Sequence, residues 1–396
     1  MKVLMINTEK DRGGAARMAT TLVNGINGLE SDVQVVLAHC GDDVLSETFR
    51  GYKKSYAYYL NLLQTRFFGS HRIYDFGFAD KVIELAKDAD VIHLHNLHGY
   101  YLDFVKLMRA IPDKPIVWTW HDMWGATGRC GFSMDCDEWK TGCSKCPHIE
   151  YYPKVWVDNA SSEFTLKSSL FKKRDNLLIV SPSDWLRDIA VESGFKKEQT
   201  FTVANPVDLS SYKAVNQGDA KKHFTLPDVP LLLFVAHDCN DERKRYKDFE
   251  KIALKSGIKG LVVGVPPENK HPDLIYLGKL NGSNELAMAY SAADAFVITS
   301  KSDNYPNTVI ESMACGTPVF GYAIGGIPSQ MPIGWDSLVE YKDITGLSNK
   351  IKKYFINSIV HAETRSLMID HAVNNWDPMV VARKYTDIYI NALEQN

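Results

Sequence analysis

The sequence predicts an α/β fold made of two Rossmann-like domains, and three observations support this prediction. Short apolar runs, typical of strands buried in parallel sheets, alternate with helical patterns along the chain. An apolar strand followed by a loop and a helix occurs twice, first at KVLMINT and again at PLLLFVAHD. The 396 residues suffice for two or three domains of roughly 100–200 residues each, and the single restart of the pattern favours two.

The composition fits a soluble, cytoplasmic enzyme. The net charge is −3, from 45 basic and 48 acidic residues, so the chain as a whole shows no preference for a polyanion such as nucleic acid. The first apolar run is too short for a signal peptide, and no window holds the ~18 apolar residues of a membrane span. We therefore expect a cytoplasmic protein without nucleic-acid partners.

The first half begins with the strand KVLMINT, a loop that contains Gly13 and Gly14, and a helix from Met18 to Ile26. Its further strands are predicted at VQVVLAH, DVIHLHN, PIVWTWHD, NLLIVSPS and FTVA. Because they lack a Cβ, Gly13 and Gly14 let the backbone approach a ligand, although ordinary turn glycines explain them equally well. The loop is not a GxGxxG motif, and no suitable acid follows the second strand, which disfavours an oxidoreductase.

The second half follows a turn-rich segment at Asn205–Asp208. Its strands are predicted at PLLLFVAHD, GLVVGV, LIYLGKL, AFVITS and TPVFGYA. A basic loop, NDERKRYKD, and a helix through Ile252 come after the first of these strands. Near the C-terminus, Asp377 to Leu393 has the pattern of an amphipathic helix.

The loop SDNYPN after the strand AFVIT leads into a helix over Asn307–Cys315. Either Asn307 or Thr308 is expected to open this helix, and Gly316 is expected to close it in a left-handed conformation. Unpaired N–H groups at a helix start attract phosphate. The amides near Asn307, Thr308 and Val309 are therefore candidates to hold a diphosphate.

Two carboxylates flank this helix start. Glu311, one turn into the helix, would accept hydrogen bonds from a ribose, and Asp303 in the loop would face the group that the phosphate carries. A loop acid and a helix acid eight positions apart, taken alone, are more often structural or solvated. The surrounding string decides between these interpretations.

The run from Asp303 through Glu311, continued by ESMACGTPV and GGIP, resembles the donor motif of retaining glycosyltransferases, specifically glycosyltransferase family 4. The resemblance implies the GT-B architecture, in which two Rossmann-like domains face each other across a cleft and a C-terminal helix crosses back to the first domain. It assigns residues 1–208, completed by 376–396, to the acceptor side, and residues 209–375 to nucleotide-sugar binding. Asp303 stands where a Glu is more usual, which leaves the sugar preference open.

The basic loop supplies positive charge for a leaving diphosphate. The resemblance places an Arg and a Lys here, matched by Arg243 and Lys244, and commonly a glycine next, where this chain has Arg245. Which of the three cations faces the phosphates stays open. The alternative to phosphate binding is that this run of charges is simply a solvated surface. Because these cations substitute for a metal, no catalytic metal is expected; the two Asp-x-Asp strings, at residues 88–90 and 135–137, do not resemble magnesium sites.

His121 ends an apolar strand, where α/β folds gather functional groups, although a lone histidine there is more often structural. Family members carry His-Asp at this position, with the histidine near the donor sugar. The resemblance therefore implies that His121 orients a sugar hydroxyl or stabilises developing charge, and that Asp122 fixes its tautomer or contacts the acceptor.

His93 and His95 in VIHLHN share one face of a strand. Two metal ligands or ordinary strand packing both explain them, and packing is preferred because no third ligand follows at a known spacing. Asn96 and His98 are expected to line the acceptor end of the cleft.

A cysteine cluster occupies an insertion over residues 125–150. Its members are Cys130, Cys136, Cys143 and Cys146, spaced by five, six and two residues. In a cytosolic chain this spacing favours a structural zinc site over disulfides or packed free thiols. The remaining cysteines, Cys40, Cys239 and Cys315, are expected to be isolated and buried.

Residues 49–72 interleave aromatic and basic side chains. Such a segment suits an anionic membrane surface or covers the mouth of a cleft, and an ordinary amphipathic helix explains it equally well. Because many family members extend lipid-linked glycans, peripheral contact with the inner face of the membrane is a further hypothesis.

The predicted function is therefore that of a retaining glycosyltransferase of the capsule and exopolysaccharide type. The resemblance implies transfer from a UDP- or GDP-sugar to a glycan or lipid-linked saccharide acceptor, with His121, Asp303 and Glu311 as the catalytic group. The alternatives are a nucleotide-sugar epimerase, a glycan phosphorylase, or a silent subunit that binds sugar nucleotides without turnover.

Overall fold

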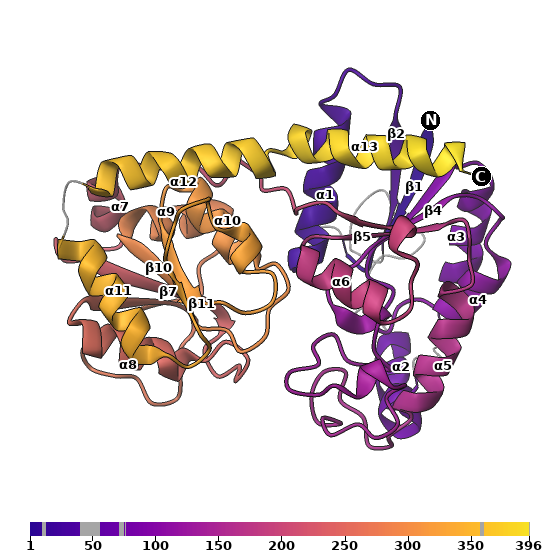
Figure 1. The fold of residues 1–396 in the computed structure, drawn as a ribbon, viewed down its shortest axis with the longest axis horizontal. Helices are drawn as coiled ribbons and strands as arrows, with labels where there is room; N and C mark the ends of the chain where they lie inside the picture. The colour runs from indigo at the N-terminus through magenta and orange to yellow at the C-terminus, as the bar shows by residue number, and fades with distance from the viewer. Residues whose placement is uncertain (10–12, 40–55, 71–74, 76, 357–359, 396) are drawn as a thin grey trace. The chain divides into compact units, whose positions relative to one another are not determined.

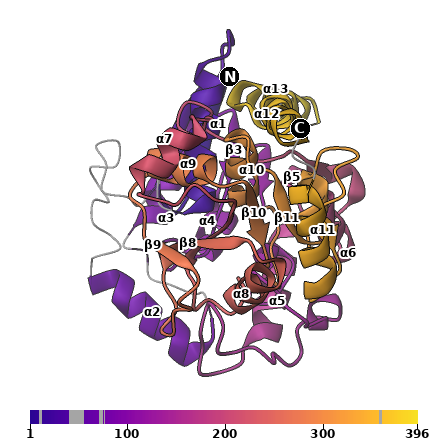
Figure 2. The same cartoon turned by 90° about the vertical axis from the view of Figure 1, so that its left-hand side faces the viewer.

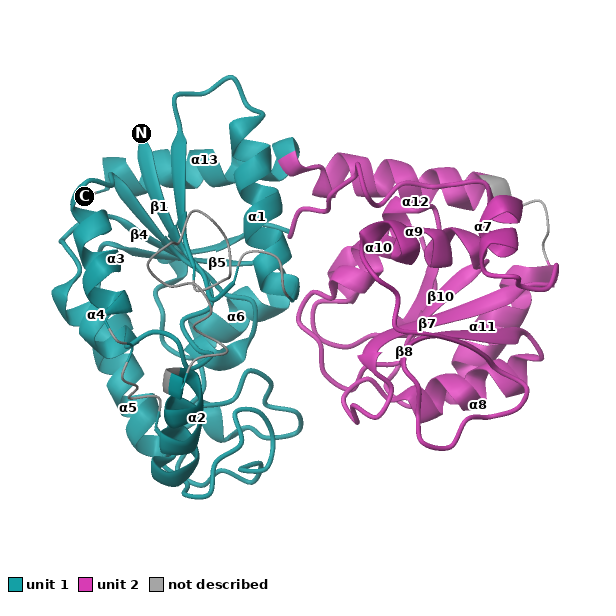
Figure 3. Ribbon diagram, turned by 180° about the vertical axis from the view of Figure 1, so that it is seen from behind, with its two compact units in different colours: residues 1–204, 379–396 teal, residues 205–378 magenta. Residues whose placement is uncertain are grey.

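The computed structural model divides the chain into two compact units (Figure 3). The first comprises Met1–Ala204 and Met379–Asn396, and the second comprises Asn205–Pro378. The structure describes all residues except 10–12, 40–55, 71–74, 76, 357–359 and 396. No helix in the described part of the chain is long and apolar enough to cross a membrane.

The first unit is built on a parallel sheet of six strands in the order β2-β1-β3-β4-β5-β6 (Figure 1). The strands are β1 (Lys2–Ile6), β2 (Gln34–Ala38), β3 (Val91–Leu94), β4 (Ile116–Thr119), β5 (Leu177–Ser181) and β6 (Thr200–Thr202). The strand order reverses between β1 and β3, and open α/β sheets bind ligands at such a switch point. His95 follows β3 at this place in the sheet.

Helices cover both faces of this sheet, which is why its central strands are buried throughout. The helices of the unit are α1 (Gly14–Asn27), α2 (Tyr56–Phe68), α3 (Phe78–Lys87), α4 (Phe104–Ala110), α5 (Ala160–Phe171), α6 (Asp184–Glu192) and α13 (Pro378–Glu394). On one face α1 and α13 share a core cluster, to which Leu22, Tyr385 and Tyr389 belong. From Met379 onward α13 is part of the first unit, which confirms that the C-terminal helix returns to it.

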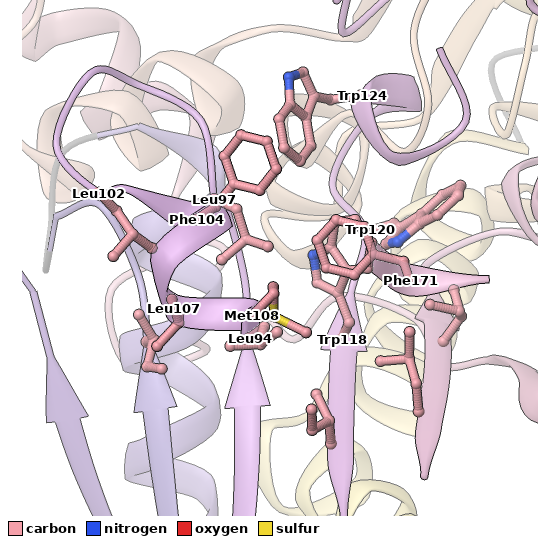
Figure 4. Packing of buried hydrophobic residues seen from close by; sticks show 14 of the residues in the cluster. Leu94, Leu97, Leu102, Phe104, Leu107, Met108, Trp118, Trp120, Trp124 and Phe171 are labelled. Atoms are coloured by element: carbon pink, nitrogen blue, oxygen red, sulfur yellow. The ribbon is translucent and has the colours of Figure 1, made fainter. Parts of the chain in front are cut away.

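The other face holds an aromatic core under α3, α4, α5 and α6. Trp118 on β4 stacks near Phe171 with ring centroids 4.5 Å apart, and Trp124 meets Phe104 edge-on at 5.2 Å (Figure 4). The indole N–H of Trp118 also donates to the carbonyl of His95 at 3.0 Å. These bulky side chains fix the loops that leave β3 and β4.

The second unit carries another parallel sheet of six strands, in the order β12-β11-β10-β7-β8-β9. Its strands are β7 (Leu231–Asp238), β8 (Lys259–Val265), β9 (Ile275–Gly278), β10 (Ala295–Ile298), β11 (Val319–Tyr322) and β12 (Leu338–Val339). Numbered within the unit this is the Rossmann order, and its switch point lies between β7 and β10. The basic loop follows β7 and the loop with Asp303 follows β10, so both predicted donor segments meet at the switch point.

Two groups of helices cover the second sheet. They are α7 (Gln217–His223), α8 (Tyr246–Ser256), α9 (Ser283–Ala292), α10 (Asn307–Ala314), α11 (Ile344–Ile356) and α12 (Val360–Trp376). The helices α8 and α11 lie together (Figure 2) and share a core cluster with β7, β10 and β11. Helix α10 packs instead against α9 and α12.

The predicted strands of both halves are confirmed, as are the helices at α1, α8, α10 and α13. The sequence analysis did not anticipate α12, whose apolar residues do not form a single clear stripe. Two six-stranded parallel sheets flanked by helices confirm the α/β class and the presence of two Rossmann-like units.

Candidate active site

Asp303 lies at the centre of a charge cluster at the switch point of the second unit. Its carboxylate is buried, and its Oδ2 lies 2.6 Å from Lys244 Nζ and 3.2 Å from a guanidinium nitrogen of Arg243. The hydroxyl of Ser300 donates to the same oxygen at 3.0 Å. Burial alone would raise the pKa of Asp303, but the two cations and these hydrogen bonds hold it below its usual range.

Backbone hydrogen bonds fix the two loops that carry these groups. The amide of Lys301 donates to the Arg243 carbonyl at 2.7 Å, and the Thr299 hydroxyl donates to the carbonyl of Lys244 at 3.0 Å. The loop after β7 and the loop after β10 are thus held side by side. Because the backbone is held in place, the cation–carboxylate geometry depends on the fold more than on flexible side chains.

Arg245 turns away from this cluster. It adopts φ 55° and ψ 44°, the left-handed conformation that glycine adopts without steric cost. Its guanidinium donates to both carboxylate oxygens of buried Asp248, at 2.9 and 3.1 Å. Among the three cations of the basic loop, Arg243 and Lys244 contact Asp303, whereas Arg245 contacts the first turn of α8.

Helix α10 begins at Asn307 without a side-chain cap, because Pro306 takes the N-cap position. The helix thus begins at Asn307, as predicted, but neither Asn307 nor Thr308 caps it. The Asn307 side chain instead accepts a hydrogen bond from Asn205 at 3.3 Å. The amide of Val309 donates to the Pro306 carbonyl at 3.1 Å, so this amide is engaged inside the first turn.

Glu311 lies one turn into α10 and is buried. The hydroxyl of Tyr290 donates to its carboxylate at 3.2 Å. Burial, reinforced by the charge of Glu311, raises the pKa of Tyr290 far above its usual value, so this hydroxyl stays a donor. Gly316 has φ 76° directly after the helix, which confirms its predicted role as the left-handed terminator.

The glycine loop of the first unit starts α1. Gly14 is the first residue of the helix, and Gly13 precedes it with φ 96° and ψ 166°, a backbone conformation open to glycine and strained for other residues. An added Cβ at Gly13 would meet no atom within 4 Å. The structure therefore explains this glycine by its backbone angles.

His121 lies just beyond β4. Its Nε2 is 2.9 Å from Nδ1 of His95, and the two rings stack with centroids 5.2 Å apart. Burial lowers the pKa of His121 to about 4, against the opposing charge of Asp122, so the ring is neutral near pH 7. His93 is buried in the core of the unit. Its Nδ1 lies 2.7 Å from the Tyr389 hydroxyl and its Nε2 lies 2.8 Å from the Thr119 hydroxyl, which fits the predicted packing role.

Asp122 contacts His98 through its second oxygen. The distance from Asp122 Oδ2 to His98 Nε2 is 3.0 Å, and Asp122 Oδ1 accepts the amide of Trp124 at 2.9 Å. The residue seen against Nε2 of His121 is His95. Asn96 and His98 border a small cavity together with His95, His121 and Asp122.

The structure does not show the predicted zinc site at the four cysteines of the insertion. Cys130, Cys136, Cys143 and Cys146 are free thiols, and no group of three or more His, Cys, Asp or Glu in the described part of the chain is arranged to hold a metal ion. Sγ of Cys143 accepts the Gly128 amide, and burial raises the pKa of this thiol to about 11. The four thiols still lie near enough to act on one another, since Cys146 helps to raise the pKa of Cys130 and that of Cys136.

Two of the three other cysteines are buried as predicted. Cys239 and Cys315 have exposed fractions of 5% and 0%. Cys40 lies outside the described residues.

Sequence reasoning missed three contributors to these clusters, namely Ser300, Tyr290 and His95 in its contact with His121. Ser300 touches Asp303 from three positions earlier in the same loop, and Tyr290 touches Glu311 from α9. A lone serine or tyrosine carries no distinguishing sequence pattern. The contact of His95 with His121 depends on the parallel register that pairs His93 with Val117 and brings the ends of β3 and β4 together, and no sequence pattern gave that register.

Comparison with known proteins adds independent evidence. A family model described as Glycosyltransferase Family 4 matches residues 12–211, which is half of the chain, and one described as Glycosyl transferases group 1 matches residues 245–357. The putative colanic acid biosynthesis glycosyl transferase WcaC of Escherichia coli (strain K12) is 31% identical over 240 residues. That match spans 58% of this chain and 58% of WcaC.

Solved structures agree on the fold. HepE from Anabaena, in a complex with UDP, superposes with a TM-score of 0.69 at 15% identity, covering 99% of this chain and 100% of HepE. WaaG, a glycosyltransferase involved in lipopolysaccharide biosynthesis, superposes with a TM-score of 0.62 at 12% identity, covering 98% of this chain and 99% of WaaG. These similarities confirm the GT-B class of fold, and the family model that covers half of the chain shows its membership: the chain belongs to glycosyltransferase family 4.

Proposed function

We propose that this protein transfers a sugar from a nucleoside diphosphate donor, a UDP- or GDP-sugar, to a glycan or lipid-linked saccharide acceptor in the synthesis of a bacterial surface polysaccharide. The observation that carries the proposal is the meeting of Arg243 and Lys244 with Asp303 at the switch point of the second sheet, beside α10. Family membership supports the reaction class. The names of WcaC and WaaG, which refer to colanic acid and lipopolysaccharide biosynthesis, support the type of product.

In this proposal the second unit binds the donor. Arg243 and Lys244 neutralise the diphosphate, and the amides of Asn307 and Thr308 add N–H donors from the start of α10. Glu311 accepts hydrogen bonds from the ribose. The donor phosphates compete with Asp303 for the two cations, which frees the carboxylate to bind a sugar hydroxyl.

Bond cleavage puts negative charge on the departing phosphate while the sugar becomes oxocarbenium-like. Lys244 and Arg243 stabilise the negative charge on the phosphate, because both side chains are already held in place and need little reorganisation. His121 is assigned to the donor sugar. We propose retention of the anomeric configuration, with attack on the face that the phosphate leaves and the phosphate accepting the proton of the acceptor hydroxyl.

The function is tested with a panel of UDP- and GDP-sugars, first by thermal shift and then by NMR of the products formed with saccharide acceptors. We expect one donor class to stabilise the protein and to be turned over with retention. An inverted product would refute the proposed mechanism. Binding without turnover for every acceptor would favour a silent sugar-nucleotide-binding subunit.

Asp303→Glu tests the role assigned to Asp303. The added methylene pushes the carboxylate further toward the sugar, so the ratio of kcat/KM between the best and second-best donor sugars is expected to change roughly tenfold. Competition assays with paired donors measure this ratio. Asp241→Glu is the matched control, because Asp241 also contacts Arg243, at 3.4 Å, but has no role at the sugar in this proposal. An unchanged ratio in Asp303→Glu would remove Asp303 from the sugar site.

We also propose peripheral membrane contact through α2. The helix carries no acidic residue and exposes a set of apolar and aromatic side chains, Tyr56, Tyr59, Leu60, Leu63, Phe67 and Phe68. Exposed Trp156 extends this set, since its ring lies 4.6 Å from that of Phe67. Exposed aromatic rings on a helix that itself carries no carboxylate suit an anionic lipid surface.

Co-sedimentation with anionic phosphatidylglycerol vesicles at low salt measures this contact. The wild-type protein is expected to pellet with the vesicles, and the double variant Leu63→Ser with Phe68→Ser is expected to lose roughly tenfold in binding, as removal of buried apolar area predicts. Ile333→Ser is the control, because Ile333 is equally apolar and fully exposed in the second unit. A wild-type protein that stays in the supernatant would contradict the proposal.

A further inference from the structure

His95 is a buried histidine for which the sequence predicted only strand packing. It follows β3 at the switch point of the first sheet and is 1% exposed. Its ring lies between two other imidazoles, with centroids 4.3 Å from His93 and 5.2 Å from His121. Of these neighbours only His121 reaches the edge of the buried cluster, where it is half-buried.

The backbone of His95 is fixed on both sides. Its amide donates to the carbonyl of Ile6 on β1 at 2.9 Å, and its carbonyl accepts the indole N–H of Trp118 at 3.0 Å. Its ring is further confined by the tilted stack on His93, which itself contacts the Tyr389 and Thr119 hydroxyls. A ring held in this way can set the position and the protonation of whatever it contacts.

The single polar contact of the His95 ring is through Nδ1. That atom lies 2.9 Å from Nε2 of His121, while Nε2 of His95 is buried and has no hydrogen-bond partner among the described residues. One of the two atoms in the contact must carry the proton. If His121 donated, a neutral His95 would hold its proton on the buried Nε2, and an unpaired buried N–H is rarer in folded proteins than an unpaired acceptor.

We infer that His95 is a positioning residue that donates from Nδ1 to Nε2 of His121 and thereby holds His121 as the tautomer with its proton on Nδ1. His93 cannot specify a tautomer in the same way, because both of its partners are hydroxyls that donate or accept. Burial supports the neutral state of both rings, since it lowers the pKa of His121 to about 4 and that of His95 well below its usual value.

The tautomer limits what His121 can do in catalysis, a consequence that rests on the proposed function. With Nδ1 protonated and Nε2 already accepting, His121 donates a hydrogen bond to a ligand oxygen, such as a donor sugar hydroxyl or a phosphate. It has no lone pair left to take a proton from the acceptor hydroxyl. The base of the transfer reaction must then be another group.

The tautomer is measured by two-dimensional ¹H–¹⁵N NMR of protein labelled with ¹⁵N-histidine, with His121→Asn used to assign the signals. We expect a protonated Nδ1 and an unprotonated Nε2 for His121 near pH 7. A protonated Nε2 would overturn the inference. Because this readout needs no substrate, it stands even if no nucleotide sugar is turned over, and failure of the proposed function is recognised separately.

Two variants test the role of His95 itself. His95→Leu is expected to shift the tautomer of His121 and to lower kcat roughly 5- to 10-fold, the effect of one lost hydrogen bond. His95→Asn is expected to restore much of kcat, because its amide N–H takes the place of Nδ1. Tyr389→Phe removes a hydroxyl that contacts His93 and should leave the His121 signals unchanged. Unchanged His121 signals in a folded His95→Leu protein would overturn the assignment.

Discussion

Lys244→Ala is expected to lower kcat for sugar transfer about 10²–10³-fold, the cost of removing one preorganised group that stabilises transition-state charge. Lys244 reaches Asp303 at 2.6 Å from the loop after β7, and its side chain is largely buried. When the donor phosphate departs, its growing charge meets this ammonium in a partly desolvated place, where the interaction is stronger than in water. Steady-state kinetics with the preferred donor measure the loss.

The matched control is Lys247→Ala. Lys247 carries the same charge three residues further on, but it is exposed and pairs with Glu250 on α8. Its removal is expected to leave kcat unchanged within error, since an exposed ion pair contributes little. Equal losses in the two variants would mean that the net charge of the loop matters, and the specific contact of Lys244 does not.

Glu311→Ala is expected to lower kcat/KM roughly 10- to 100-fold, mainly by raising KM for the donor, because a buried charged acceptor for the ribose is lost. Isothermal titration with UDP and GDP measures the same loss without any acceptor. The loss in nucleotide affinity should match the rise in KM, since the ribose contact is the same in the ground state and the transition state.

Tyr290→Phe separates this binding role from a structural one. The variant removes the hydrogen bond that Tyr290 donates to Glu311 at 3.2 Å while the carboxylate stays in place. It is expected to lower the free energy of unfolding by about 1 kcal/mol and to keep most of the nucleotide affinity. If Tyr290→Phe weakened nucleotide binding as much as Glu311→Ala, Glu311 would be a structural residue.

The fold and the elements that carry the donor motif could be predicted because their signals are local. Four to eight apolar residues in a row, bounded by turn residues, mark a strand buried on both faces, and Gly316 marks the end of α10. The start of α10 was less certain. Asn307 and Thr308 are both good caps by type, but Pro306, with an extended ψ of 124°, occupies the N-cap position.

The choice among the three cations could not be predicted from the basic loop. Arg243, Lys244 and Arg245 are adjacent and chemically alike, and only the left-handed backbone at Arg245 turns the last of them toward Asp248. The cysteine cluster is the opposite case. Its spacing suits zinc and its thiols act on one another's pKa, yet no metal-binding group is found among the described residues.

The sequence alone therefore determined two parallel α/β units, a glycine-started helix in the first, and two acids flanking a helix start in the second. Only the tertiary structure decided that Lys244 meets Asp303 across 59 positions, and that His95 meets His121 across 26. Hydrophobic periodicity and turn chemistry act over a few residues. Side-chain pairing across a sheet depends on strand order and register, which local patterns do not encode.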